Sequence, residues 1–129
     1  MAAAAINTAF GGTRPPTFGG NEADFPEWSF VTDAYIRRHD GAGRLVDQAL
    51  VSDNPIEIDG MTPDAVKLAQ HIQTDLVLLC TDKARRLLMN LPEKSNGFES
   101  WRVLTRRFTG SGPNSKRGQM HAILKFDFP

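Results

Sequence analysis

The basic side chains in the second half of the chain are the residues best suited to chemistry, and that chemistry is the recognition of negative charge. Arg102, Arg106 and Arg107 fall on one side of a helix predicted over residues 96–108, with only Glu99 nearby to balance them. Lysine and arginine neutralise phosphates whatever the base sequence. The residues predicted to contact RNA or another subunit are Arg102, Arg106, Arg107, Lys116 and Arg117.

The charges of the chain are divided between its two halves. Lys and Arg number 15 in all, as do Asp and Glu, so the formal net charge is zero. Residues 1–82 nevertheless hold 5 basic and 12 acidic side chains, whereas residues 83–129 hold 10 basic and 3 acidic ones. Opposite charges separated in this way favour head-to-tail association or contact with a polyanion, while a pair of solvated faces is the simpler alternative.

Patterns typical of catalytic or metal sites are missing from the sequence. His39, His71 and His121 are far apart, and none has a second His or Cys four residues away, the spacing that helical metal sites use. We interpret His71 and Asp75 as a surface pair, and Cys80, at the end of an apolar stripe, as a core residue. We therefore expect no enzymatic activity, no metal and no cofactor.

The helix predicted over residues 96–108 organises the rest of the chain. Asn96 is suited to cap its first turn, with Glu99 three residues later reaching back to the amide of the cap. Gly110 marks the end of the helix. Its apolar residues recur at steps of three, three and four, which places them on one buried face. These core residues are Phe98, Trp101, Leu104 and Phe108.

Two helices are predicted before residue 52. The first begins with Asp24 as its cap and Pro26 in its first turn, and it buries Trp28 and Tyr35 on one face. Phe30 is placed beside that face. A short helix follows over residues 43–51, and residues 53–61 form a loop.

The second half of the chain is also predicted to be helical. A helix starting at Pro63 has the cleanest apolar stripe, which includes Leu76, and we expect it to be the central buried helix. Whether residues 63–91 form one bent helix or two is open. A last helix is predicted from Ser115, with Met120, Ile123 and Leu124 pointing inward.

The fold class that follows is all-α: a bundle of five or six helices over residues 23–129, preceded by a flexible or extended Gly/Pro-rich arm over residues 1–22. A further domain is expected to follow. The single cysteine excludes an internal disulfide, and neither a secretory signal nor a long apolar run is present. We expect a cytoplasmic protein without membrane contact.

Three segments of the chain resemble the Gag polyprotein of LTR retroelements, most closely its copia-type branch. The first joins Phe18-Gly19-Gly20 to Phe25-Pro26-Glu27-Trp28, and the second is the helical stretch closing on residues 84–91. The third is the run of residues 97–104 followed by Arg106-Arg107-Phe108. In such Gags an F-x-G arm leads into a helix bearing a tryptophan, and a later W-x-x-L helix ends in basic and aromatic residues.

The resemblance implies a capsid-like N-terminal domain that assembles with copies of itself into a shell around the element's RNA. The chain departs from a whole Gag because the Cys/His zinc knuckle is missing, and the second capsid domain would lie beyond Pro129. Two alternatives remain open. One is an RNA-binding module that uses the basic helical face, and the other is a domesticated, Gag-derived adaptor that binds peptide in an apolar groove.

Overall fold

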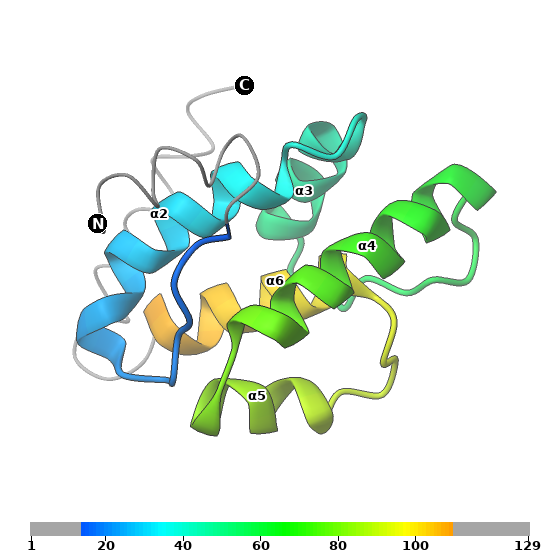
Figure 1. The fold of residues 1–129 in the computed structure, drawn as a ribbon. Helices are drawn as coiled ribbons and strands as arrows, with labels where there is room; N and C mark the ends of the chain where they lie inside the picture. Colours follow the sequence, from blue (N-terminus) through cyan, green and yellow to red (C-terminus); the bar gives the residue numbers. More distant parts are fainter. Residues whose placement is uncertain (1–13, 110–129) are drawn as a thin grey trace.

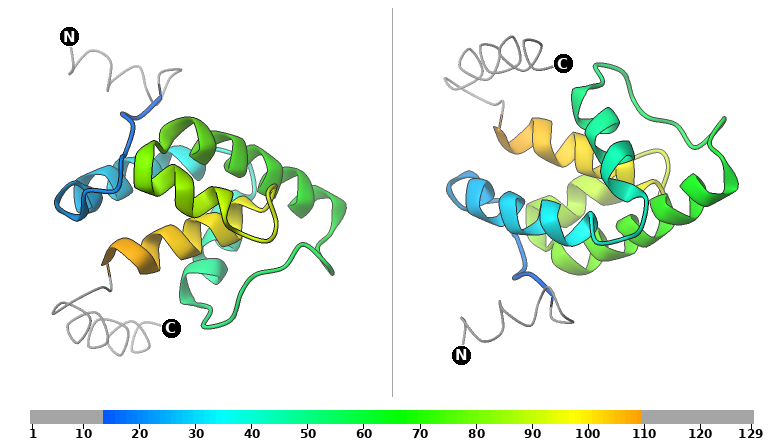
Figure 2. Two further views of the ribbon diagram at one scale, coloured as in Figure 1. Left: turned by 90° about the horizontal axis from the view of Figure 1, so that it is seen from below. Right: turned by 90° about the horizontal axis from the view of Figure 1, so that it is seen from above.

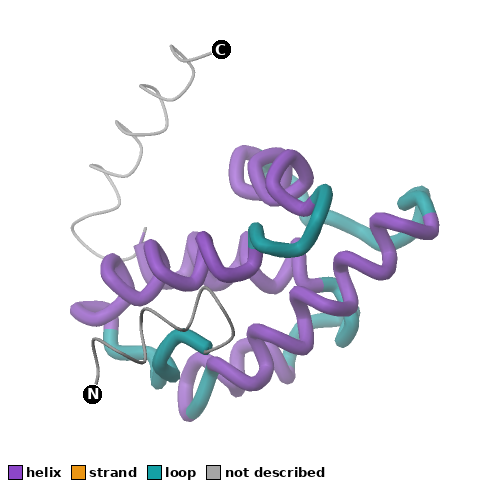
Figure 3. Tube along the Cα trace, turned by 45° about the horizontal axis from the view of Figure 1, so that its top comes forward, coloured by secondary structure: helices purple, strands orange, loops and turns teal. Residues whose placement is uncertain are grey.

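The computed structural model describes residues 14–109, and this part of the chain is helical (Figure 1). No strand occurs among these residues, which confirms the all-α prediction (Figure 3). No helix here is long and apolar enough to cross a membrane. The elements are the short 3-10 helix η1 (Glu22–Asp24) and the helices α2 (Phe25–Ile36), α3 (Ala42–Val51), α4 (Pro63–Leu79), α5 (Asp82–Met89) and α6 (Gly97–Thr109).

Helix α6 lies at the centre, in contact with α2, α3, α4 and α5. Figure 2 shows it with α4 and α5 across one side and α2 and α3 across the other. The sequence predicts α4 as the central element, but the outer face of α4 is exposed at Val77 and Leu78. The apolar stripe of α4 is long because α4 is long, whereas α6 is covered on more than one side.

The apolar residues predicted from helical spacing form one core. Aromatic rings make up its densest part: Phe18 stacks on Trp28 with ring centroids 4.7 Å apart and meets Phe108 edge-on at 5.0 Å. Trp28 in turn packs edge-on against Trp101 at 5.8 Å. All the predicted core residues are buried, namely Trp28, Tyr35, Leu76, Phe98, Trp101, Leu104 and Phe108.

Residues 14–20 form no helix, and they lie across the junction between α4 and α5. The Phe18 amide donates to the Leu79 carbonyl at 2.8 Å, and the Thr81 amide donates to the Phe18 carbonyl at 2.9 Å. These bonds form an isolated parallel bridge between Phe18 and Cys80. Cys80 has extended backbone angles, so residues 63–91 contain two helices rather than one bent helix.

The helix starts agree with the sequence in part. Thr62 caps α4, since its hydroxyl accepts a hydrogen bond from the Ala65 amide at 3.2 Å. Asp24 precedes α2 as expected but makes no side-chain cap bond. The cap is one element earlier, where the Asn21 side chain accepts from the Ala23 amide at the start of η1. The predicted helix from Ser115, with Met120, Ile123 and Leu124, lies outside the described residues.

Candidate interaction surfaces

Arg102 is not on an exposed basic face, and this corrects the sequence-based prediction. Its side chain is only 8% exposed and makes two parallel hydrogen bonds to the Glu99 carboxylate, at 2.9 and 3.0 Å. A third bond runs to the carbonyl of Ser52 at 3.4 Å. Arg102 therefore joins α6 to the end of α3 and is not available to a phosphate.

The neighbouring arginines are exposed, but both have acidic partners within the chain. Arg106 donates to the Ser52 carbonyl and to the Asp53 carboxylate, the latter at 3.2 Å. Arg107 lies 3.9 Å from the carboxylate of Glu22. Lys116 and Arg117 lie outside the described residues. The structure thus pairs Arg106 and Arg107 with carboxylates of the acidic half of the chain, whereas Arg102 pairs with Glu99 of its own helix.

The start of α6 fastens the loop between α3 and α4. Asn96 caps the helix as predicted, since its side-chain oxygen accepts from the Glu99 amide at 3.2 Å. Glu99 does not reach back to the cap, however. Its carboxylate accepts from the Ile56 amide at 2.7 Å, while the Asn96 side chain donates to the Ile56 carbonyl at 2.8 Å. Glu93 holds the Ile58 amide in the same way, at 3.1 Å.

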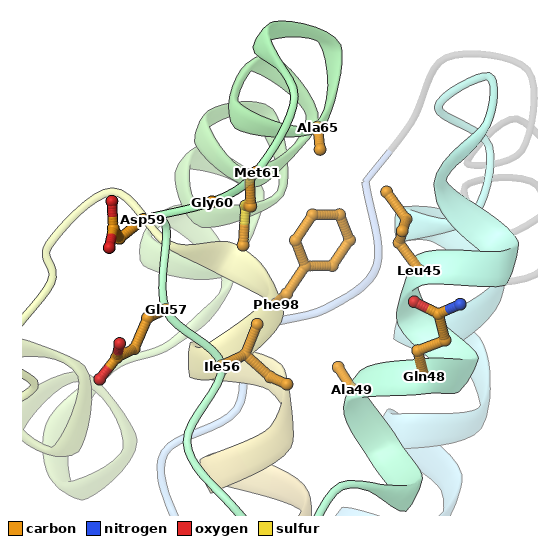
Figure 4. A pocket seen from close by; sticks show the side chains of 10 residues that line it. All are labelled: Leu45, Gln48, Ala49, Ile56, Glu57, Asp59, Gly60, Met61, Ala65 and Phe98. Atoms are coloured by element: carbon orange, nitrogen blue, oxygen red, sulfur yellow. The ribbon is translucent and has the colours of Figure 1, made fainter.

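This fastened loop forms one wall of an apolar pocket of 250 Å³ (Figure 4). The ring of Phe98, from α6, points into the pocket, and Ala65 of α4 stands above it in this view. The α3 side is made by Leu45 and Ala49, and the loop side by Ile56 and Met61. Three helices and a loop therefore converge on one apolar hollow.

The pocket has an acidic mouth. Glu57 and Asp59, on the loop, are both exposed and point outward from the hollow (Figure 4). Neither makes an ion pair with a described residue. The sequence-based prediction for residues 53–61 was a loop. The alternation of Ile56 and Ile58 with acids was the available signal, because it predicts one face turned inward and one outward.

The outer face of α2 carries a second apolar feature. Phe30 is 79% exposed, which corrects its placement beside the buried face. It lies five residues after the buried Phe25, about 140° around the helix at about 100° per residue, so it points away from the core. A shallow groove runs alongside Phe30, bounded by Ala34, Leu50 and Trp101. The hydroxyl of Thr105, at this groove, is buried and has no hydrogen-bond partner among residues 14–109.

His39, His71 and Cys80 take structural positions, and His121 lies outside the described residues. Asp75 pairs with His39, at 2.7 Å, rather than with His71, although the two histidine rings lie 5.5 Å apart. No group of three or more potential metal ligands occurs within residues 14–109. Cys80 is fully buried, and burial raises the pKa of its thiol to about 12.

Comparisons with known protein families, with curated proteins and with solved structures find no match to this chain.

Proposed function

We propose that this chain is a structural module that associates with copies of itself, as the resemblance to retroelement Gag implies, and that it serves as a subunit of a capsid-like shell. The observation that carries the proposal is the exposed α2 face, where Phe30 stands beside a groove with an apolar wall. An exposed aromatic side chain that continues into a groove with apolar walls forms a larger apolar patch, and such patches are typical of contact sites.

The α2 face is complementary to itself. In an antiparallel pair of α2 helices related by a two-fold axis, Phe30 of one copy meets Ala34 of the other, because both are two residues from Thr32. Ala34 is small and exposed, and it borders the groove. A large side chain is thus opposed by a small one on each side of the axis.

The charges on α2 suit the same arrangement. Glu27 lies near the start of the helix, is exposed, and makes no ion pair with any described residue. Arg38 follows the end of the helix, and its side chain is 38% exposed although it also lies 3.6 Å from the Asp75 carboxylate of the same chain. Antiparallel pairing brings Glu27 of each copy towards Arg38 of the other, which favours this register over a parallel one.

The alternative of RNA binding through α6 has less support. Arg102 is enclosed, and Arg106 and Arg107 have carboxylate partners. Packaging of RNA by the shell therefore stays a prediction of the resemblance, and we do not assign it to α6.

Light scattering of the full chain over a range of protein concentrations tests the proposal. We expect the wild-type mass to rise with concentration. Phe30→Glu should weaken the association by at least about 2 kcal/mol, or about 30-fold, which is the usual effect of removing a central aromatic contact.

Leu78→Glu is the matched control, because Leu78 is also an exposed apolar residue of a helix but lies on α4. Its association should equal that of the wild type. Two results would rule out the α2 face as the surface of self-association. One is a wild-type chain that stays monomeric at millimolar concentration, and the other is equal weakening of association by both substitutions.

A further inference from the structure

We propose that the apolar pocket between α3, α4 and α6 is the docking site of the chain's own segment 116–125. This inference does not depend on self-association through α2, which involves a different face of the molecule. It rests on the size of the pocket, the charge at its mouth, the composition of the segment and the length of chain that joins the segment to α6.

The size of the pocket suits side chains rather than a cofactor. Its volume of 250 Å³ is below the range of about 300–1,000 Å³ that is typical of small-molecule sites. Phe98 on its inner side is 2% exposed and Ala49 is 1% exposed, so the inner surface is buried and apolar. One or two aliphatic side chains from a helix or an extended strand fill such a hollow.

The mouth of the pocket selects a basic occupant. Glu57 and Asp59 stand at its edge without an ion-pair partner in the described part of the chain. Binding of an apolar side chain in the pocket is favoured when basic residues flank that side chain. The basic residues are then attracted to the carboxylates of Glu57 and Asp59. An acidic segment is disfavoured for the same reason.

Segment 116–125 has this composition. Ile123 and Leu124 follow Met120 by three and four residues, the spacing that shares one side of a helix. Three basic residues accompany them, and the segment contains no acidic residue. The basic residues are Lys116, Arg117 and Lys125.

The segment is also tethered within reach. Phe98 and Thr109 are separated by eleven helical steps, a distance of about 17 Å. The seven residues from 110 to 116 span up to about 23 Å when extended, so the segment can return along α6 to the pocket. A short tether gives a millimolar effective concentration, which favours the chain's own segment over that of another copy.

Disulfide trapping in the full chain tests the proposal. Gln48 lines the pocket and is exposed, so the double variant Gln48→Cys, Ile123→Cys should oxidise to an intrachain disulfide in a monomer. Val77→Cys, Ile123→Cys is the matched control, because Val77 is exposed on α4 away from the pocket. The pocket pair should close about tenfold faster or more. Cys80 does not compete, since its thiol is buried and protonated.

Charge reversal gives a second readout on the same protein. Glu57→Lys with Asp59→Lys should slow the trapping, and adding Lys116→Glu with Arg117→Glu should restore it. Equal rates for the pocket and control pairs would overturn the proposal. So would a covalent dimer as the main product, because it would place the segment of another copy in the pocket, and so would charge reversal without effect.

Discussion

Glu99 and Arg102 form an ion pair that is almost closed to solvent, at the point where α6 meets the loop between α3 and α4. The carboxylate accepts from both the guanidinium and the Ile56 amide, and the guanidinium also donates to the Ser52 carbonyl. Both charged groups therefore exchange water for several protein partners. Such a pair is sensitive to the loss of one member, because the other charge then stays buried without compensation.

Arg102→Met tests this reasoning. The substitution keeps much of the side-chain volume and leaves the Glu99 carboxylate without its cation, so we expect a loss of about 3–5 kcal/mol in the free energy of unfolding. Urea denaturation followed by circular dichroism measures it. Arg106→Met is the control, because Arg106 pairs with Asp53 at the exposed surface and should cost about 0–1 kcal/mol. Equal losses of unfolding free energy in the two variants would show that burial does not make the Arg102–Glu99 pair more important than the exposed Arg106–Asp53 pair.

The role of Arg102 was beyond sequence reasoning, and the reason is physical. Helical periodicity places a residue on a face of its own helix, and for Trp101 and Leu104 this is sufficient because apolar faces are buried. Arg102 is covered by a segment that lies 50 residues earlier in the chain. Nothing in local spacing indicates which remote loop will cover a polar residue.

At the scale of elements, the close approach of α4 and α6 depends on Gly97. A Cβ atom on Gly97 would lie 2.5 Å from the Gln73 amide nitrogen and 2.6 Å from the Ile72 side chain. The two helices therefore touch backbone to backbone at this point. The Ser100 hydroxyl also donates to the Gln73 side chain there, which fixes the register of the crossing.

Gly97→Ala should destabilise the protein by about 1–3 kcal/mol, because the added methyl overpacks the crossing and forces the helices apart. Gly43→Ala is the matched control. Gly43 lies in α3, and a Cβ atom added there would have its nearest neighbour 3.8 Å away, so alanine should stabilise by about 0.5–1 kcal/mol through helix propensity. Thermal unfolding of the two variants should shift in opposite directions, and a shift in the same direction would refute the explanation.

The helices themselves were largely predictable, and their arrangement was not. Thr62-Pro63 and Asn96 gave correct starts for α4 and α6, since capping chemistry is local. The break after Leu79 could not be decided from the sequence, because it is made by Phe18, from the other end of the chain. The pocket could not be predicted either, because its walls come from three helices and a loop that only the tertiary structure brings together.

At the scale of the whole molecule, folding partly cancels the charge separation seen along the chain. Arg106 reaches back to Asp53 and Arg107 to Glu22, so basic residues of the second half lie beside acidic residues of the first. Two strongly opposed electrostatic poles are thus a weaker basis for association than the sequence indicated. The apolar face around Phe30 takes their place in the proposed function.

This difference predicts a modest effect of salt. Between 0.05 and 0.5 M NaCl the self-association constant should change by about tenfold at most, because Glu27 and Arg38 are the charges that the described α2 face offers to a second copy, and Arg38 already lies near Asp75. Light scattering at fixed protein concentration measures it. Glu27→Gln should remove most of the salt dependence that remains. If the association disappears in 0.5 M NaCl, attraction between opposite charges is its main cause, and the apolar α2 face is not.

The bridge between Phe18 and Cys80 imposes an order of events on the newly made chain. Phe18, in the earliest-synthesised strip of the described region, has backbone hydrogen-bonding partners, Leu79 and Thr81, that lie more than sixty positions downstream. Its ring also packs on Phe108, which leaves the ribosome later still. At first the Phe18 ring of the nascent strip can pack only on its near neighbours Phe25 and Trp28. The strip gains its distant partners only after nearly all of the described helices have been translated.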